Sequence, residues 1–284
     1  MSDVSVVILT MGDRPVPLKT SIESVRRQQK VDAEIVLVVN GGEPDSAEAH
    51  IVVAPGENLG IPKGRNVGLV ASSADFVAFL DDDGWYPSDD VLRQALQTFE
   101  TEPDVAVIGL RIIDQHGGTA RRHHPRLWGD HTRSGDVTSF PGGACIVRRR
   151  AFEAVGGLCE EFFYGLEETD LAWRLLNEGW TIRYSAEITM GHPRIDPARH
   201  DGYHFHTARN RVWLAHRTLP LPLAATYVTV WFVVTALRNL RSPTGLRSYA
   251  AGTRAGIRSP AGPRAPMRWR TVAAMTRLGR PPII

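Results

Sequence analysis

The strongest constraint on the fold is a series of apolar runs rich in β-branched residues, which occupy Val4–Thr10, Ala33–Val39 and Asp75–Leu80. A strand that is apolar on both faces must be covered on both faces, which is typical of parallel sheets flanked by helices. Segments with apolar residues at helical spacing separate the three runs. This alternation predicts an α/β fold with a mostly parallel sheet.

The same pattern continues to about residue 190, interrupted by a middle segment. Residues 111–143 are rich in His, Arg, Gly and Pro, and we expect little regular structure there. Further strands are expected at 51–55, 105–110, 144–149 and 180–188, and helices at 63–72, 88–100 and 167–179.

Charge is unevenly distributed along the chain. The segment from Arg238 to Ile284 holds ten of the 33 basic residues and none of the 31 acidic ones, so the rest carries 23 basic and 31 acidic residues. A basic block of this kind indicates contact with a phosphate-rich surface, either anionic lipid or nucleic acid. A solvated tail is the alternative.

A stretch of nineteen residues without a charge, Leu219–Leu237, precedes this basic segment. It reaches the lower end of a membrane-spanning length. Three interpretations stay open: a buried helix or oligomer contact, an amphipathic helix lying in the plane of a membrane, and a full span.

The cysteines and the first residues bear on the cellular compartment. Cys145 and Cys159 are the only two cysteines, and their spacing does not suit a metal site. No basic segment followed by a long apolar run opens the sequence, so a secretory signal is not expected. We expect a cytoplasmic protein.

Polar residues follow three of the predicted strands: Thr10, Asn40 and the run Asp81–Asp83. In an open parallel sheet the carboxyl ends of the strands form one crevice where ligands bind, so these residues should converge there. Three adjacent carboxylates raise one another's pKa unless a cation neutralises them, and oxygen ligands favour Mg²⁺ or Mn²⁺. An acidic turn that caps the next helix is the alternative.

Five segments, in this order, resemble the signature segments of family 2 glycosyltransferases with the GT-A fold: VSVVILT, LVVNGG, NLGIPKGRNVG, FLDDD and FFYGLEETDLAWRL. Residues 199–220 further resemble the C-terminal part of actinobacterial rhamnosyl- and galactofuranosyl-transferase-like members. The resemblance implies a Rossmann-like, nucleotide-sugar-binding GT-A domain at residues 1–215. A helical extension, first apolar and then Arg-rich, would follow at 216–284.

The resemblance also implies roles at the donor end of the site. Asp83 would bind the metal. Asp81 would contact either the metal or the ribose or base of the nucleotide, and Asp82 would assist these two aspartates. The usual pair of acids after the second strand is replaced by Val39 and Asn40, which leaves the nucleotide base open. Residues expected to border the nucleotide sugar are Thr10, Asn40, Asn58, Gly60, Lys63, Arg65 and Asn66.

A second acidic group, Glu167, Glu168 and Asp170, matches the family position of the catalytic acids at a helix N-terminus. An inverting transfer needs one base to remove the acceptor proton, and Glu168 aligns best with it, with Glu167 as the rival. Favourable interaction of acids with the helix dipole is the alternative explanation. His192 follows a later strand and matches a metal-binding position, although a structural role is equally open.

Other basic and histidine residues could border the acceptor or the diphosphate. We interpret His200, His204 and His206 as a lining of the site rather than a zinc site, because Cys and acids are absent from the group. Arg209 and Arg211 could hold phosphate or could form a solvated helix face. His123, His124 and Arg126 lie in the irregular middle segment and could border the acceptor.

Taken with these residues, the resemblance implies an inverting, metal-dependent glycosyltransferase. It would transfer a sugar from a nucleotide-diphosphate sugar to a glycan or lipid-linked acceptor. We expect a cytoplasmic enzyme that could bind anionic lipid at the inner face of the cell membrane. A sugar nucleotidyltransferase is the alternative enzyme, but no glycine-rich, lysine-containing loop follows the first strand. A catalytically silent protein that binds sugar nucleotide or polyanion also stays open. No nucleic-acid module is recognisable, so no specific nucleic acid is expected, and the oligomeric state is open.

Overall fold

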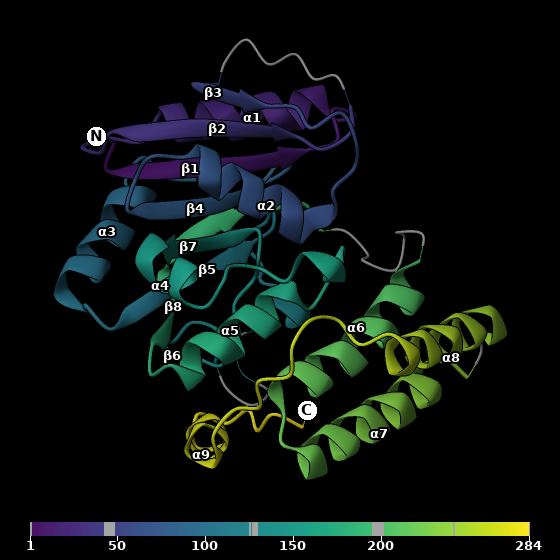
Figure 1. The fold of residues 1–284 in the computed structure, drawn as a ribbon. Coiled ribbons are helices and arrows are strands. Elements are labelled where there is room, and N and C mark those ends of the chain that lie inside the picture. The colour runs from purple at the N-terminus through teal and green to yellow at the C-terminus, as the bar shows by residue number, and fades with distance from the viewer. Residues whose placement is uncertain are drawn as a thin grey trace.

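The computed structural model describes residues 2–42, 49–124, 126, 130–194, 202–240 and 242–283. Within these residues, an eight-stranded sheet carries helices on both faces and is followed by a helical C-terminal region (Figure 1). The strands are β1 (Val4–Thr10), β2 (Ala33–Val39), β3 (Ile51–Val53), β4 (Phe76–Asp81), β5 (Val105–Ile113), β6 (Gly135–Asp136), β7 (Ala144–Arg148) and β8 (Thr181–Gly191).

The strand order is β3-β2-β1-β4-β7-β5-β8-β6. The first four strands in this order are parallel, and β5 pairs with β8 in parallel, which confirms the predicted sheet. The strand β7 is antiparallel to both of its neighbours, and the short β6 is antiparallel to β8. Leu9 pairs with Asp81 and Thr10 with Val39, so the carboxyl ends of β1, β2 and β4 meet at one edge.

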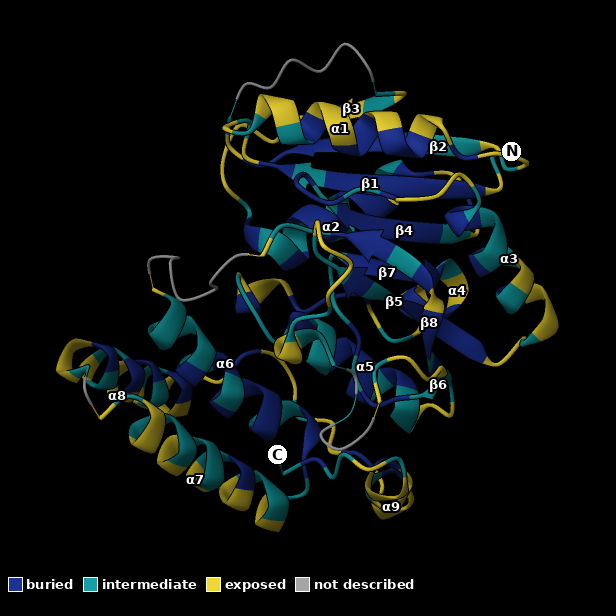
Figure 2. Cartoon of the chain, turned by 180° about the vertical axis from the view of Figure 1, so that it is seen from behind, coloured by how far each residue is buried: buried dark blue, intermediate teal, exposed yellow. Residues whose placement is uncertain are grey.

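Two layers of helices cover the sheet, because successive side chains of each strand point to opposite faces. One buried cluster joins Val6 and Ile8 to α1 (Pro15–Arg26) and α3 (Val91–Thr101). The other joins Val7 to the opposite layer, which contains α2 (Gly60–Ala71), α4 (Arg149–Ala154) and α5 (Glu167–Asn177). The strands are buried between these layers (Figure 2). Two 3-10 turns, η1 (Arg121–His123) and η2 (Glu160–Phe162), lie in the connections.

The C-terminal region contains α6 (Tyr203–Thr218), α7 (Leu221–Arg238), α8 (Pro243–Arg258) and α9 (Trp269–Arg277). Helix α6 packs along α8 and α7, and the expected boundary between residues 215 and 216 falls inside α6. After α8 the chain turns back to the body (Figure 1). There Arg264 donates to the carbonyls of His216 and Leu219, and Arg268 to that of Asn177. This part of the Arg-rich segment is therefore folded onto the protein and is not a free tail.

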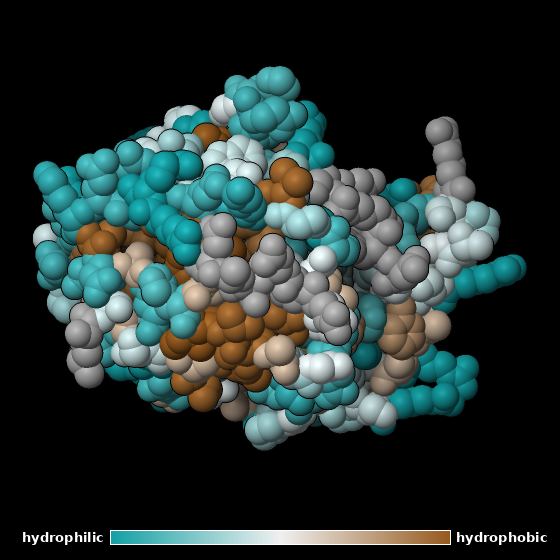
Figure 3. Space-filling view, turned by 90° about the horizontal axis from the view of Figure 1, so that it is seen from above, coloured by the Kyte–Doolittle hydropathy of each residue, from teal (hydrophilic) through white to brown (hydrophobic). Residues whose placement is uncertain are grey.

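The interpretation of Leu219–Leu237 as a buried helix is wrong, because Tyr227 is the one buried residue of α7 and the others are half-buried or exposed. Its exposed apolar residues include Leu221, Phe232, Val233 and Leu237. By length and composition, α7 is the one helix within the described residues that could cross a membrane. Apolar side chains are also exposed far from α7, and Figure 3, which looks onto the β3 side of the molecule, shows such a group within a hydrophilic surface.

Candidate active site

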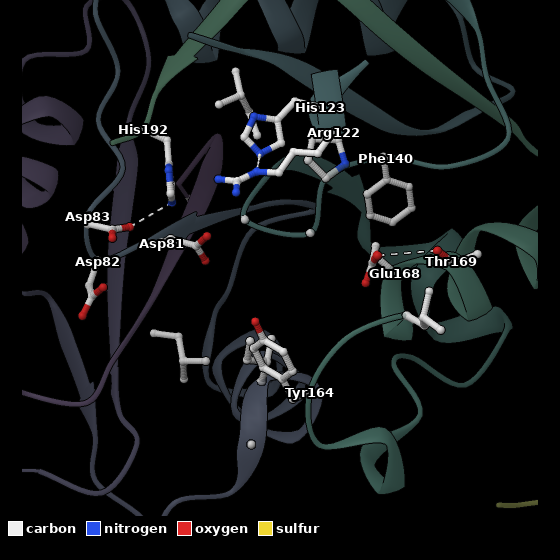
Figure 4. Close-up of a pocket in the computed structure, with 18 of the residues that line it drawn as sticks. Asp81, Asp82, Asp83, Arg122, His123, Phe140, Tyr164, Glu168, Thr169 and His192 are labelled. Carbon is white, nitrogen blue, oxygen red and sulfur yellow. Dashed lines mark hydrogen bonds and ion pairs between the residues drawn. The ribbon is translucent and has the colours of Figure 1, made fainter. Parts of the chain in front are cut away.

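A cavity of about 780 Å³ opens where the carboxyl ends of β1, β2 and β4 meet the start of α5. Asp81–Asp83 and His192 lie on one side of it, and Glu168 and Thr169 on the opposite side (Figure 4). The predicted convergence of the strand ends is therefore present. Parallel sheets place ligand sites at this edge.

Two of the three aspartates at the end of β4, Asp82 and Asp83, are held by one hydroxyl group and one guanidinium group. Thr10 Oγ1 donates to Asp82 Oδ2 at 2.8 Å, which ties the ends of β1 and β4 together. Arg14, which precedes α1, places Nη1 3.2 Å from Asp82 Oδ1 and 2.5 Å from Asp83 Oδ2. Sequence reasoning missed Arg14, although its place in the turn after β1 put it at the same edge.

Asp81, Asp83 and His192 could hold a divalent metal ion. Each offers one ligand atom, and these atoms all lie within 4.8 Å of one another. His192 Nδ1 is 2.7 Å from the carbonyl oxygen of Pro193, so this nitrogen can donate there and leave Nε2 directed at the acids. Two carboxylates and an imidazole fit Mg²⁺ or Mn²⁺ that keeps open positions for a diphosphate.

The charges of this cluster set the pKa values of its members. Burial raises the pKa of Asp82 to about 6, against the hydrogen bond from Thr10 and the charge of Arg14. Burial also acts to raise the pKa of Asp83, but the hydrogen bond from His192 and the charges of His192 and Arg14 outweigh it and lower that pKa. For His192, burial is outweighed by Asp83, so its pKa is raised. His192 Nε2 lies 3.1 Å from Asp83 Oδ1, and the two form an ion pair when His192 is protonated.

Glu168 and Glu167 are adjacent in sequence but have different surroundings. Glu168 lines the cavity, whereas Glu167 is 3% exposed and lies 3.4 Å from Arg65 Nη1 through its Oε1 atom. Burial, followed by the charge of Glu167, raises the pKa of Glu168 to about 8. A carboxylate of this basicity, facing a cavity, is suited to accept a proton.

The structure places Asp170 outside the cavity lining, which corrects its expected place among the catalytic acids. Its carboxylate is fully buried between two arginines. Arg174 Nε donates to Oδ2 at 2.8 Å, and Arg217 Nε donates to Oδ1 at 2.8 Å. Both oxygens are occupied, so Asp170 links α5 to α6 and has no free edge for a substrate.

The residues expected around the nucleotide fall into two groups. Thr10, Asn40, Asn58 and Gly60 all line the cavity. Asn40 Nδ2 lies 3.1 Å from Asn58 Oδ1, and Asn40 Oδ1 accepts the backbone N–H of Leu59 at 2.7 Å. Asn40 therefore fixes the turn into α2 and does more than border a ligand.

Lys63, Arg65 and Asn66 lie on α2 but do not line the cavity. Arg65 Nη2 is 2.9 Å from Asp81 Oδ1, so this buried arginine bridges Asp81 and Glu167. Asn66 Nδ2 donates to the carbonyl of Leu158 at 2.9 Å, and Asn66 Oδ1 accepts the backbone N–H of Leu158 at 3.0 Å. Arg65 and Asn66 thus position other parts of the site, and neither touches the cavity.

A clamp that sequence reasoning missed holds the loop before α5. Asn210 of α6 is fully buried and its Nδ2 donates to the carbonyls of Phe162, Tyr164 and Gly165, at 2.9, 2.8 and 2.8 Å. Leu166, at the end of this loop, has φ 70°, a conformation that costs a residue with a Cβ atom about 1–3 kcal/mol. The clamp sustains this conformation and so fixes where α5 presents Glu168.

The histidine and arginine candidates are dispersed. His206 and His123 line the cavity, whereas His204 packs against Gly245 and His200 lies outside the described residues. His124 also lines the cavity, while Arg126 donates to the carbonyls of Arg133 and Asp136. Arg209 donates to the carbonyl of Phe162 and lies over the Trp213 ring.

Glycines let the chain approach the acids closely. An added Cβ at Gly143 would lie 2.0 Å from Asp81 Oδ2, and one at Gly142 would lie 2.5 Å from Arg65 Nη1. Both glycines precede β7, and any side chain there would displace Asp81 or Arg65. The two adjacent glycines are visible in the sequence, but they lie in the segment 111–143, where we expected little regular structure.

Comparison with known proteins supports the same family. The profile of Glycosyl transferase family 2 matches residues 5–156. A curated relative, the Pre-mycofactocin glycosyltransferase of Mycobacterium tuberculosis, is 28% identical over 245 residues, which cover 76% of this chain and 45% of that protein. This chain thus spans about half the length of that relative.

Two solved structures share the fold. The crystal structure of S. aureus TarS 1-349 matches with a TM-score of 0.65 at 13% identity. The match covers 89% of this chain and 78% of the TarS chain. The mannosyltransferase PcManGT from Pyrobaculum calidifontis, in complex with GDP-Man and Mn²⁺, matches with a TM-score of 0.58 at 15% identity. The match covers 97% of this chain and 79% of the PcManGT chain. At these identities the likeness concerns the fold.

Proposed function

The chain belongs to glycosyl transferase family 2 and has the GT-A fold, and on this premise we propose that it is an inverting, metal-dependent glycosyltransferase. It would transfer a sugar from a nucleotide-diphosphate sugar to an acceptor hydroxyl group. One observation carries the proposal. The Asp81–Asp83 and His192 cluster faces Glu168 across one cavity (Figure 4).

The donor is expected at the aspartate side of the cavity. Asp83, Asp81 and His192 would hold Mg²⁺ or Mn²⁺, which when bound would neutralise the diphosphate and stabilise charge on the leaving group. Thr10 and Asn40 fix the strand ends and the turn that would border the nucleotide. The relative that was solved with GDP-Man and Mn²⁺ supports this arrangement.

Glu168 is the proposed general base. Because it lies opposite the aspartates, Glu168 would face the anomeric carbon from the side away from the leaving diphosphate, and attack from that side would invert the configuration. Glu168 would accept the proton of the acceptor hydroxyl group. Glu167 is less suited to this role because Arg65 engages its carboxylate inside the protein.

We further propose that α7 lies in the plane of the cytoplasmic membrane surface, where the enzyme would meet a glycan or lipid-linked acceptor. Its exposed apolar residues, such as Phe232 and Leu237, accompany exposed arginines on α7 and α8, such as Arg238 and Arg254. Apolar residues flanked by arginines are suited to an anionic lipid surface. On its other face Tyr227 is buried against Trp173, and this contact favours a helix that lies on the surface over one that leaves the body to span.

A panel of UDP-, GDP- and dTDP-sugars, tested with Mn²⁺, Mg²⁺ or chelator, examines the proposal. We expect slow donor hydrolysis with one nucleotide class that stops with chelator, because water can replace the acceptor. Binding of a donor without turnover under any condition would instead support a catalytically silent sugar-nucleotide-binding protein. Release of pyrophosphate from a nucleoside triphosphate would support a nucleotidyltransferase.

A further inference from the structure

A second, smaller cavity of about 70 Å³ adjoins the first at its Glu168 side. The two cavities share four lining residues, Ser139, Leu166, Thr169 and Arg280. About 10–15 Å³ on this measure admits one water molecule, so the smaller cavity has room for a carboxylate or phosphate group.

Two arginines from distant parts of the chain meet in this smaller cavity. Arg211 comes from α6, and its guanidinium lies 3.5 Å above the Trp231 ring while Nη1 donates to the Tyr227 hydroxyl group at 2.9 Å. Arg280 follows α9, and its Nη1 donates to Ser139 Oγ at 2.6 Å. Among the described residues no carboxylate lines this cavity, and neither arginine makes an ion pair.

Three residues that line the same cavity also carry buried polar atoms without hydrogen-bond partners among the described residues. Arg211 Nε, Trp231 Nε1 and Thr138 Oγ1 are buried and have none within the described part of the chain. Two of these groups can only donate, and a hydroxyl group can donate as well. An unpaired buried donor costs about 1–3 kcal/mol, so the cavity is suited to a ligand that accepts hydrogen bonds.

Glu168 acts on Arg280 as an opposite charge, but among the described residues it forms no ion pair with either arginine. The charges that act most on Glu168 are those of Glu167 and Arg65. Arg280 is bonded to Ser139, and the other guanidinium near it, Arg211, is a like charge. Two guanidinium groups with open donors at one small cavity therefore call for an anion from outside the chain.

We propose that Arg211 and Arg280 form a subsite for an anionic group of the acceptor, either a carboxylate or a phosphate. The inference rests on the proposed function, because it uses Glu168 as the group that faces the acceptor hydroxyl. The donor diphosphate belongs to the aspartate side of the large cavity, on the opposite side from Glu168 (Figure 4). An anion beside Glu168 is therefore part of the acceptor.

Anion binding can be measured without any turnover. The full chain, labelled with ¹⁵N and kept in chelator at constant ionic strength, is titrated with inorganic phosphate, with acetate and with chloride. We expect the indole N–H resonance of Trp231, assigned through Trp231→Phe, to shift saturably with phosphate or acetate and not with chloride. Tighter binding of phosphate would indicate that the natural ligand carries a phosphate group, and tighter binding of acetate would indicate a carboxylate.

Substitutions connect this shift to the two arginines. Arg280→Gln and Arg211→Gln are each expected to weaken anion binding at least tenfold. Arg277→Gln is the matched control, because Arg277 is exposed in the same segment and bonds only a carbonyl of its own helix. No shift in the wild-type protein, or equal binding by Arg280→Gln and Arg277→Gln, overturns the subsite.

Kinetics separate failure of the subsite from failure of the proposed function. Neutral glycosides and their uronate and phosphate analogues serve as acceptors, and Arg280→Gln should raise the KM of the anionic ones at least tenfold while leaving donor KM unchanged. Transfer to neutral and anionic acceptors with equal KM sustains the glycosyltransferase and overturns the subsite. Saturable anion binding without hydrolysis or transfer of any donor sustains the subsite as an anion site and overturns the proposed function.

Discussion

The replacement Asp170→Asn separates a structural acid from a catalytic one. Asp170 is fully buried, and both of its oxygens accept from guanidinium groups, Arg174 on one side and Arg217 on the other. Removing one member of a buried ion pair costs about 3–5 kcal/mol, because it leaves a buried charge without compensation. Arg174 keeps its bonds to the carbonyls of Val155 and Gly157, so we expect the lower end, about 3 kcal/mol.

This loss corresponds to a decrease in Tm of about 6 °C for a chain of this size. The assay is urea unfolding followed by circular dichroism, combined with donor hydrolysis at a temperature where the variant is folded. We expect the midpoint to fall while hydrolysis per folded molecule stays within about tenfold of wild type. Glu168→Gln, two residues earlier in the same helix, is the control and should behave oppositely, with unchanged stability and lost turnover. An Asp170→Asn protein as stable as wild type but inactive would refute the assignment.

Three further predictions concern the base, the clamp and the membrane surface. The pKa of Glu168 is raised to about 8, and a general base must be deprotonated to act. We therefore expect kcat/KM to rise with pH up to about 8 and then to level off. A flat profile between about pH 6 and 8 contradicts this role. Asn210→Ala, which frees three carbonyls before α5, should lower kcat with little change in donor KM, and the reverse pattern would contradict the clamp. Phe232→Asp with Leu237→Asp should abolish sedimentation with anionic vesicles, whereas Val70→Asp, at a more exposed apolar residue on α2, should not. Equal loss in both would argue against α7 as the contact.

Much of the sheet and of the donor side follows from local sequence. Strands that are apolar on both faces have few ways to be covered, so the runs around Val7 and Leu37 predict the layers that α1 and α2 complete. The convergence of Thr10, Asn40 and Asp81 follows from parallel pairing, since parallel strands end at the same edge. The antiparallel direction of β7 does not follow, because an isolated apolar strand carries no sign of its direction.

The Glu168 side of the cavity, where we propose that the acceptor binds, depends on contacts between residues far apart in the chain. Ser139 and Arg280 are 141 residues apart, and no local pattern at either position indicates the other. The Asp170 assignment was open to a simple test, however. Residues two apart on a helix point to nearly opposite sides, so Glu168 and Asp170 could not both face one cavity. Composition predicts that the Arg-rich segment contacts a phosphate-rich surface or forms a solvated tail, and it does not show that some of its arginines fold back onto backbone carbonyls, as Arg264 does.

The most direct test of the central claim compares donor binding and turnover in two variants, Asp83→Ala and Glu168→Gln, by calorimetry and by donor hydrolysis with Mn²⁺, with Mg²⁺ and with chelator. The proposed mechanism predicts that the wild-type protein binds one nucleotide sugar only with metal and that Asp83→Ala does not bind it. Glu168→Gln should bind it normally without turnover. Donor binding that ignores both chelator and Asp83→Ala would show that the aspartate run does not hold the diphosphate and would contradict the account.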